Sequence, residues 1–480
     1  MRRHQRTPQR TPRITGTDGL DRLDDRSRRL VLWTCCMSVF IVGMDMYAVN
    51  VALPQMNDSL GASVSQLQWV VSAYALSTAG LLMLAGSVAD RIGRRRVFQA
   101  GLSLFALGSL VSSFAPNAEV LIASRVVQGV GGSMLNPVAL SIITNTFLEP
   151  KARARALGTW SAAIGLAMAI GPPVGGLLVT LISWRAVFWI NIPVALTAII
   201  LAARFIPESS AASPRRLDPP GQVLMVVFLL GVNAGLIEGA ALGWSHPFVL
   251  TCFLGAVVAV LLFLWWENRT EQPLLSPSFF RSRPFSAAVI SAVVAFSATS
   301  GFLFVITLYL QQARGFEPLQ AGMLTVPLAL MVALCASVSG RMVGAFGPAP
   351  SLMIAGAVMA VAGLLMNGIG ADTPLWYLMM AFAVYGTGFG IVNTPITNAA
   401  VSGLPKDQAG TAAAVTSTSR QVGNSLGAAV FGSVLVSRLG DEGLAGFADA
   451  AQPVWWALSS AGLVILLAGW AVRGIKLGGD

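Results

Sequence analysis

The sequence is built largely from apolar blocks, each about as long as a lipid bilayer is thick. A membrane-spanning helix needs roughly 20 apolar residues, because hydrocarbon offers no hydrogen-bond partner to a free backbone amide. The best interpretation of the 480 residues is fourteen such blocks, although their soft boundaries also allow twelve or thirteen. The blocks lie near residues 31–54, 67–89, 97–115, 119–141, 157–181, 186–206, 221–242, 247–266, 285–310, 318–342, 350–370, 374–397, 409–436 and 453–473. Only 11% of the residues are charged, against about a quarter in soluble domains, so we predict an all-α membrane protein.

Basic residues crowd every second connection between the predicted spans. These connections and the N-terminal tail contain Arg2, Arg29, Arg91, Arg94, Arg95, Arg96, Lys151, Arg153, Arg155, Arg204, Arg215, Arg216, Arg269, Arg281, Arg283, Arg341, Lys406, Arg473 and Lys476. The alternate connections contain only Arg185, Arg314 and Arg438. This bias is the positive-inside pattern, which places both chain termini in the cytoplasm. It accounts for the net charge of +10 without nucleic acid, and a basic tail that binds RNA is the alternative for residues 1–29.

Four regions follow from the pattern of spans: a basic tail (1–29), a six-helix bundle (30–206), linkers around an inserted pair of helices (207–284), and a second six-helix bundle with a short tail (285–480). Glycine pairs repeat between the two bundles at an offset of about 255 residues. They are Gly86 and Gly93 against Gly340 and Gly347, and Gly129 and Gly131 against Gly386 and Gly388. Two related six-helix bundles around a central site are the plan of many secondary transporters.

The connection after the second span carries a compact motif, namely Gly86, Asp90, Arg91, Gly93 and Arg94. Arginines at this place would contact anionic lipid phosphates, but that role requires neither the aspartate nor the glycines. The pattern resembles the signature loop of the major facilitator superfamily, G-x-x-x-D-R-x-G-R-R. The resemblance implies the major facilitator fold, and an aspartate that helps to lock the two halves together. The second bundle has Gly344 at the matching position, so this lock would be one-sided.

The fourth span carries Arg125, Gln128 and Gly129. A charged residue at the centre of a membrane helix costs roughly 2.5–3.5 kcal/mol on insertion scales, so it is rarely without a function. The alternative is an arginine that extends its side chain to the outer interface. The arrangement resembles the R-x-x-Q-G motif of the superfamily, which implies that Arg125 takes part in proton transfer.

The fifth span carries a run of small residues and prolines, namely Gly165, Gly171, Pro172, Pro173, Gly175 and Gly176. Proline removes a helical hydrogen bond and glycine lets a neighbouring helix approach, so the pattern alone predicts a bend with a smooth face. It resembles the G-P-x-x-G-G antiporter motif, which implies an exporter, because the uptake branches of the superfamily generally lack it.

The first span carries Asp45, Tyr47 and Asn50 within a stretch that resembles D-x-T-x-V-N-V-A-L-P, a motif of fourteen-span drug–proton antiporters. Tyr47 stands where that motif has threonine, which puts the local hydrogen bonding around Asp45 in question. An acid inside a membrane can load and release a proton, so Asp45 and Arg125 are the predicted proton-coupling residues. A purely structural ion pair between them is the alternative, and a proton that breaks such a pair would free the helices to move.

Six polar or charged residues are candidates for lining a substrate cavity, namely Tyr47, Asn50, Gln128, Glu238, Asn393 and Arg420. For Arg420, pairing with a helix carbonyl and facing the cavity are equally good interpretations. For Glu238, an interfacial position is the alternative to a ligand contact. The spans hold few other acids, so we expect a neutral, zwitterionic or monocationic substrate rather than a dication.

The resemblance as a whole implies a monomeric exporter of small lipophilic drugs or antibiotics in the bacterial inner membrane, driven by protons through alternating access. It implies no cofactor and no metal, and anionic lipid at the cytoplasmic arginines. A lipid or glycolipid exporter would share the same motifs. A proton-coupled uptake symporter would not be expected to keep the glycines of the fifth span. An integral membrane enzyme would need a nucleophile–base pair or a metal-ligand set, and the sequence suggests neither.

Overall fold

The computed structural model describes residues 24–211, 217–270, 275, 277–370, 372–402, 404, 409–439 and 447–473. Within these residues, twelve helices are long and apolar enough to cross a membrane. The predicted spans at 97–115 and 409–436 form helices of 20 and 31 residues that are not among the twelve. A span count of fourteen therefore stays a prediction. Residues 1–23, Arg215, Arg216, Lys406 and Lys476, which entered the charge argument, lie outside the described residues.

The helices follow the order that the apolar blocks predict. The first bundle contains α1 (Asp25–Leu60), α2 (Val64–Ile92), α3 (Arg94–Ser113), α4 (Ala118–Thr146), α5 (Pro150–Leu181), α6 (Ala186–Trp189) and α7 (Asn191–Phe205). The inserted pair is α8 (Pro219–Leu242) and α9 (Pro247–Glu267). The second bundle contains η2 (Pro277–Arg281), α10 (Arg283–Leu308), η3 (Tyr309–Ala313), α11 (Pro318–Leu324), α12 (Val326–Phe346), α13 (Pro348–Met366), α14 (Leu375–Ser402), α15 (Ala409–Leu439) and α16 (Phe447–Ala471).

Local sequence explains several helix ends. Gly61 ends α1 with φ of 61°, in the left-handed region that favours glycine, and Ser63 and Gln66 form a capping box that begins α2. Two predicted spans are each broken into two helices: the span at 186–206 forms α6 and α7, and the span at 318–342 forms α11 and α12. α7 begins with a proline in its first turn, Pro193, and α12 with Pro327; since proline donates no backbone hydrogen bond, it suits a helix start better than a helix interior.

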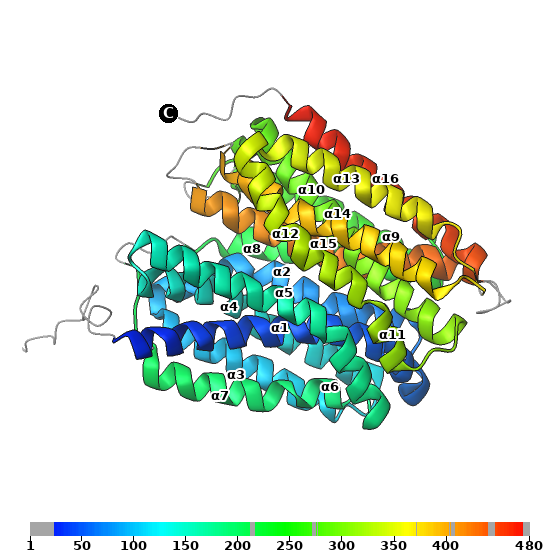
Figure 1. Ribbon diagram of the computed structural model, residues 1–480, viewed down its shortest axis with the longest axis horizontal. Helices are drawn as coiled ribbons and strands as arrows, with labels where there is room; N and C mark the ends of the chain where they lie inside the picture. The colour runs from blue at the N-terminus through cyan, green and yellow to red at the C-terminus, as the bar shows by residue number, and fades with distance from the viewer. Residues whose placement is uncertain are drawn as a thin grey trace, which may run out of the picture.

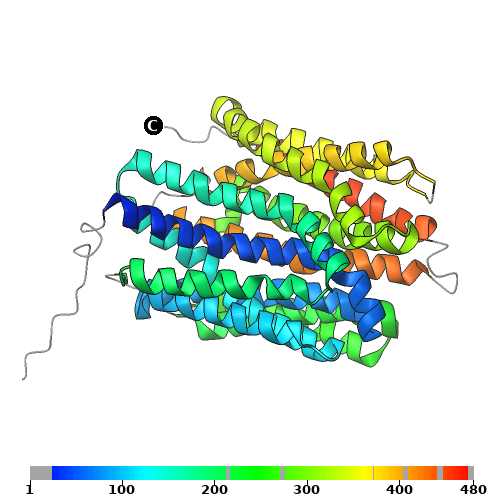
Figure 2. The same ribbon diagram turned by 60° about the horizontal axis from the view of Figure 1, so that its bottom comes forward.

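The helices run side by side along one direction, as the two views show (Figures 1 and 2). α1 begins at the left of Figure 1, and α16 runs from the right of the picture toward its upper left; we call the end of the molecule where α1 begins and α16 ends the proximal end. The distal end carries the α1–α2 connection. In Figure 1 the helices α1, α3, α4, α5 and α7 form the lower group, and α10, α12, α13, α14 and α16 form the upper group. α8 packs against α2 of the first bundle and α15 of the second, so the inserted pair contacts both halves.

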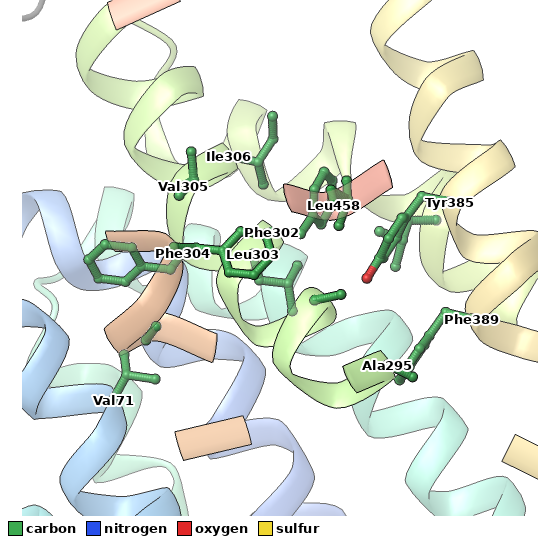
Figure 3. Packing of buried hydrophobic residues seen from close by; sticks show 14 of the residues in the cluster. Val71, Ala295, Phe302, Leu303, Phe304, Val305, Ile306, Tyr385, Phe389 and Leu458 are labelled. Carbon is green, nitrogen blue, oxygen red and sulfur yellow. The ribbon is translucent and has the colours of Figure 1, made fainter. Parts of the chain in front are cut away.

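The repeated glycines lie at equivalent helix contacts in the two halves. A side chain on Gly131 would meet the backbone of α3 at Phe105, and one on Gly388 would meet α13 at Met359. Both contacts are between the third and fourth helices of a bundle, which supports the internal repeat. The core of the second half is aromatic, with the Phe302 and Tyr385 rings stacked at 4.7 Å (Figure 3).

Candidate functional site

Asp45 of α1 and Arg125 of α4 form a buried ion pair in the first half. Arg125 Nη1 lies 2.5 Å from Asp45 Oδ2, and each residue is 1% exposed. The alternative in which Arg125 extends to the membrane interface is therefore wrong, because its guanidinium lies inside the bundle. A buried pair of this kind stays stable only when the other polar atoms of both groups are also satisfied.

Three further side chains complete the shell around the Asp45 carboxylate. Gln128 Nε2 donates to Asp45 Oδ1 at 3.1 Å, and Asn191 Nδ2 donates to the same oxygen at 2.9 Å. Ser109 Oγ accepts from Gln128 Nε2 at 2.7 Å and lies 3.4 Å from Asn191 Nδ2. The carboxylate is thus fixed by residues of α1, α3, α4 and α7, and we call Asp45, Arg125, Gln128, Asn191 and Ser109 the carboxylate cluster.

The arginine of the cluster is held by the neighbouring helix as well. Arg125 Nε donates to the backbone oxygen of Val70 at 3.1 Å, and the guanidinium lies 4.4 Å from the centre of the Tyr74 ring. Both partners belong to α2, and cation–π contact of this kind is strongest where water is excluded. A proton on Asp45 would neutralise the carboxylate and leave Arg125 charged, so the cluster can convert protonation into a force on three helices.

The motif loop at residues 86–96 is folded onto the segment that follows α7. Asp90 Oδ1 accepts from Arg94 Nη2 at 2.9 Å, and the Asp90 backbone oxygen accepts from Ala211 N at 2.9 Å. The backbone of Arg94 donates to Ser209 O at 2.9 Å. These contacts hold the loop within the first half and its linker, and a lock between the halves through Asp90 stays a prediction. Arg91, the third charged residue of the predicted motif, is exposed.

Glu208 is a central residue of this loop contact that the sequence did not single out. Its Oε1 accepts from Arg95 N at 3.1 Å, and its Oε2 lies 3.8 Å from Arg95 Nε and 3.6 Å from Arg96 Nε. Glu208 also lies directly beside Gly93. Gly86, at the start of the motif, approaches Pro137 of α4 at ordinary contact distance.

Replacing Gly93 with alanine is expected to destabilise the protein by about 1–3 kcal/mol. Gly93 has φ of 116°, which favours glycine, and an added Cβ would collide with the Glu208 carboxylate. Thermal unfolding in detergent measures the effect, with Gly158→Ala as control, because a Cβ at that helical position meets nothing within 4 Å. Equal stability of the two variants would show that the loop adapts freely.

The glycines of α5 contact two different helices. Cβ atoms on Gly171 and Gly175 would lie 2.9 Å from Tyr47 Cβ and 2.8 Å from Ala48 Cβ, so this face packs on α1. Gly176 abuts the backbone of Pro318 in α11, which belongs to the second half. In return, Gly322 of α11 abuts the carbonyl of Pro172. Gly165 does not belong to this close packing, because an added Cβ there would meet nothing within 4 Å.

Hydrogen bonds join the two halves near the distal end. Gln311 Nε2 donates to Val51 O at 2.8 Å, and Leu319 N donates to Thr180 Oγ1 at 3.3 Å. Gln68 of α2 donates to Ala428 O of α15 at 3.0 Å. Together with the glycine contacts of α5 and α11, these bonds close the distal end.

The candidate cavity residues separate into groups. Tyr47 and Asn50 line a small cavity of about 20 Å³ between the halves, together with Phe296, Phe389 and Asn424. Gln128 belongs instead to the carboxylate cluster.

Arg420 and Asn393 lie together beside this central cavity. Arg420 Nη2 lies 2.5 Å from Thr397 Oγ1 and 3.4 Å from Asn393 O, and its guanidinium is 5.7 Å from the centre of the Phe296 ring. Arg420 therefore contacts a helix carbonyl and adjoins Phe296, an aromatic residue that lines the cavity; that Arg420 itself faces the cavity stays a prediction.

Glu238 lies apart from the other candidates, on the inserted helix α8. Its Oε1 accepts from Trp69 Nε1 of α2 at 2.8 Å. Two residues earlier, the Leu236 backbone oxygen accepts from Ser433 Oγ of α15 at 2.6 Å. α8 is thus hydrogen-bonded to both halves near the distal end.

Comparison with known proteins gives the family context of this geometry. A sequence profile described as Major Facilitator Superfamily matches residues 35–223 and 222–428. The chain is 34% identical over 415 residues to "Multidrug resistance protein Stp" of Mycobacterium tuberculosis, which covers 86% of this chain and 77% of that protein. It is 36% identical over 394 residues to "Methylenomycin A resistance protein" of Streptomyces coelicolor, and the match covers 82% of this chain and 83% of that protein. It is 35% identical over 413 residues to "Tetracenomycin C resistance and export protein" of Streptomyces glaucescens, and the match covers 85% of this chain and 76% of that protein.

A solved structure shares the arrangement of helices. The peptide transporter POT in complex with sulfate superposes with a TM-score of 0.69, at 15% identity, over 92% of this chain and 96% of that one. Likeness at this level of identity shows the fold alone.

Proposed function

This chain belongs to the Major Facilitator Superfamily, and from that premise we propose that it exports small lipophilic drugs or antibiotics in exchange for protons. It is a multi-pass membrane protein, with many helices long and apolar enough to cross a bilayer. Several relatives are named for resistance to drugs or for their export, which supports the same kind of cargo here. All are bacterial, which supports a place in a bacterial cell membrane.

The observation that carries the proposal is the carboxylate cluster. Asp45 is a buried acid whose charge is balanced by Arg125, so gain of a proton leaves the arginine without its counter-charge. The guanidinium is bonded to α2 and the carboxylate to α7, so the change acts on the relative positions of several helices. A proton taken up on one side and released on the other would in this way drive alternating access.

The positive-inside pattern assigns the proximal end to the cytoplasm and the distal end to the outside. On that orientation the packing of α5 on α11 closes the outer end, which supports our proposal that this state faces the cytoplasm. At about 2.3 kcal/mol per charge per ~100 mV, one proton crossing ~150 mV releases about 3.5 kcal/mol, enough for roughly a few-hundred-fold accumulation.

The proposal is tested by dye efflux from cells that express the protein. We expect cells loaded with ethidium to lose the dye faster than cells with the empty vector, and a protonophore should abolish the difference. Efflux that continues after the proton gradient has collapsed would contradict proton coupling. Transport of a fluorescent phospholipid analogue, with no effect on dyes or antibiotics, would favour a lipid exporter instead.

A further inference from the structure

A second cavity, larger than the central one, lies where the inserted pair meets both halves. It has a volume of about 160 Å³ and is lined by residues of α2, α8, α10, α15 and η2. Ala79 and Gly80 supply the wall from the first half, and Val289 and Val293 supply the wall from the second. All four lie in the half of their helix nearer the proximal end. The cavity is distinct from the central cavity at Tyr47 and Asn50 and from the carboxylate cluster.

The wall of this cavity is mainly apolar but contains two buried polar atoms without a hydrogen-bond partner. They are Gln222 Oε1 of α8 and Thr418 Oγ1 of α15, on residues that are 5% and 8% exposed. Buried polar atoms in proteins are nearly always paired, so an unpaired one on a residue that lines a cavity needs an explanation. A threonine in a helix ordinarily bonds the backbone one turn earlier, as Thr416 does with Ala412 O at 2.7 Å.

We propose that this cavity binds the lipophilic part of the exported compound, with a hydroxyl group of that compound bonded to Gln222 and Thr418. The inference rests on the proposed function only in taking the occupant to be the exported compound. Apolar pockets with a few polar groups are typical ligand sites, and an engineered apolar cavity of about 150 Å³ in another protein binds benzene. The cavity size suits one aromatic ring system, and because both polar side chains are uncharged, they suit a neutral hydrogen-bonding group on it.

The position of the walls makes occupancy depend on the conformation of the transporter. α2 moves with the first half, whereas α10 and α15 move with the second, so movement of the halves changes the shape of the cavity. A ligand that binds one state better than the other shifts the equilibrium toward that state. This gives the inserted pair a part in function, because α8 supplies Gln222 and the neighbouring wall residues Met225 and Phe228.

The binding of two matched probes to purified protein in phospholipid nanodiscs tests the proposal. The probes are radiolabelled 1-naphthol and 1-methylnaphthalene, which have similar shapes and differ in the hydroxyl group. We expect Thr418→Val and Gln222→Met each to weaken 1-naphthol binding by about threefold to tenfold and to leave 1-methylnaphthalene binding unchanged. Thr416→Val is the matched control, because its hydroxyl is already bonded within α15, and it should bind both probes as the wild type does.

A cavity-filling variant gives an independent result. Ala79→Leu is expected to weaken the binding of both probes, provided that the variant elutes as a monodisperse peak. The proposal is wrong if Thr418→Val and Gln222→Met bind 1-naphthol like the wild type. It is also wrong if the wild type holds tightly bound phospholipid that Ala79→Leu loses, because the occupant is then an acyl chain. Dye efflux separates the two proposals. If the probes bind as expected but the protein does not export dye, only the proposed function is refuted. If the protein exports dye but the variants do not change probe binding as expected, only the proposed role of the cavity is refuted.

Discussion

Replacing Asp45 with asparagine is expected to abolish proton-driven efflux, with at least a tenfold loss of the protonophore-sensitive rate. Asparagine keeps the size and an acceptor oxygen but cannot exchange a proton. It also leaves Arg125 buried without a counter-charge, and breaking a buried pair in this way costs about 3–5 kcal/mol of stability. Ethidium efflux and thermal unfolding of the purified variant measure the two effects separately.

Two further variants distinguish proton coupling from a purely structural ion pair. Asp58→Asn makes the same change on the same helix at an exposed position, and it should leave efflux unchanged. Combining Asp45→Asn with Arg125→Gln removes the unpaired charge, so stability should recover while efflux stays lost. If efflux returns with stability in the double variant, the ion pair is structural and Asp45 does not carry the proton.

Replacing Gly176 with alanine is expected to prevent the halves from closing at the distal end and to reduce efflux severalfold. A Cβ at this position would overlap the backbone of Pro318 and Leu319, which no side-chain rotation can relieve. Overpacking of this kind costs about 1–3 kcal/mol, and here the cost falls on one conformational state. Distances between spin labels on the distal ends of α5 and α11 should shift to longer values.

The matched control is Gly165→Ala, the same substitution on the same helix. Because a Cβ there meets nothing within 4 Å, its efflux and distal distances should match those of the wild type, with slightly higher stability because alanine favours helix. If both variants behave alike, the antiporter glycines act through the bending of α5 rather than through contact with α11.

Much of the helical framework could be predicted because it depends on local sequence. Length and apolar character alone locate the spans, and prolines 193 and 327 explain why two of them are broken. The pairing of Asp45 with Arg125 could be anticipated because charged residues inside a membrane usually pair with a residue of opposite charge. The glycine pattern of the fifth span predicted that Gly175 and Gly176 lie in a helix contact. It could not predict that Gly175 faces α1 and Gly176 faces α11.

The residues that sequence reasoning missed are ordinary polar residues brought together only by the fold. Asn191 and Ser109 complete the carboxylate cluster from helices far apart in the chain, and neither has a charge that would mark it. Glu208 lies in a linker, where an acidic residue is unremarkable until the motif loop is seen to pack on it. The cavity at Gln222 depends on where the inserted pair docks, and no local pattern determines that.

The contact of α8 with both halves has a kinetic consequence. The bonds of Glu238 to Trp69 and of Leu236 to Ser433 join the inserted helix to the two halves, which move relative to each other in the proposed alternating access. At least one of these bonds has to break and form again in every cycle, so the inserted pair contributes to the activation barrier for turnover. Under the proposed function, variation along α8 at these bonds is then expected to change the rate of transport.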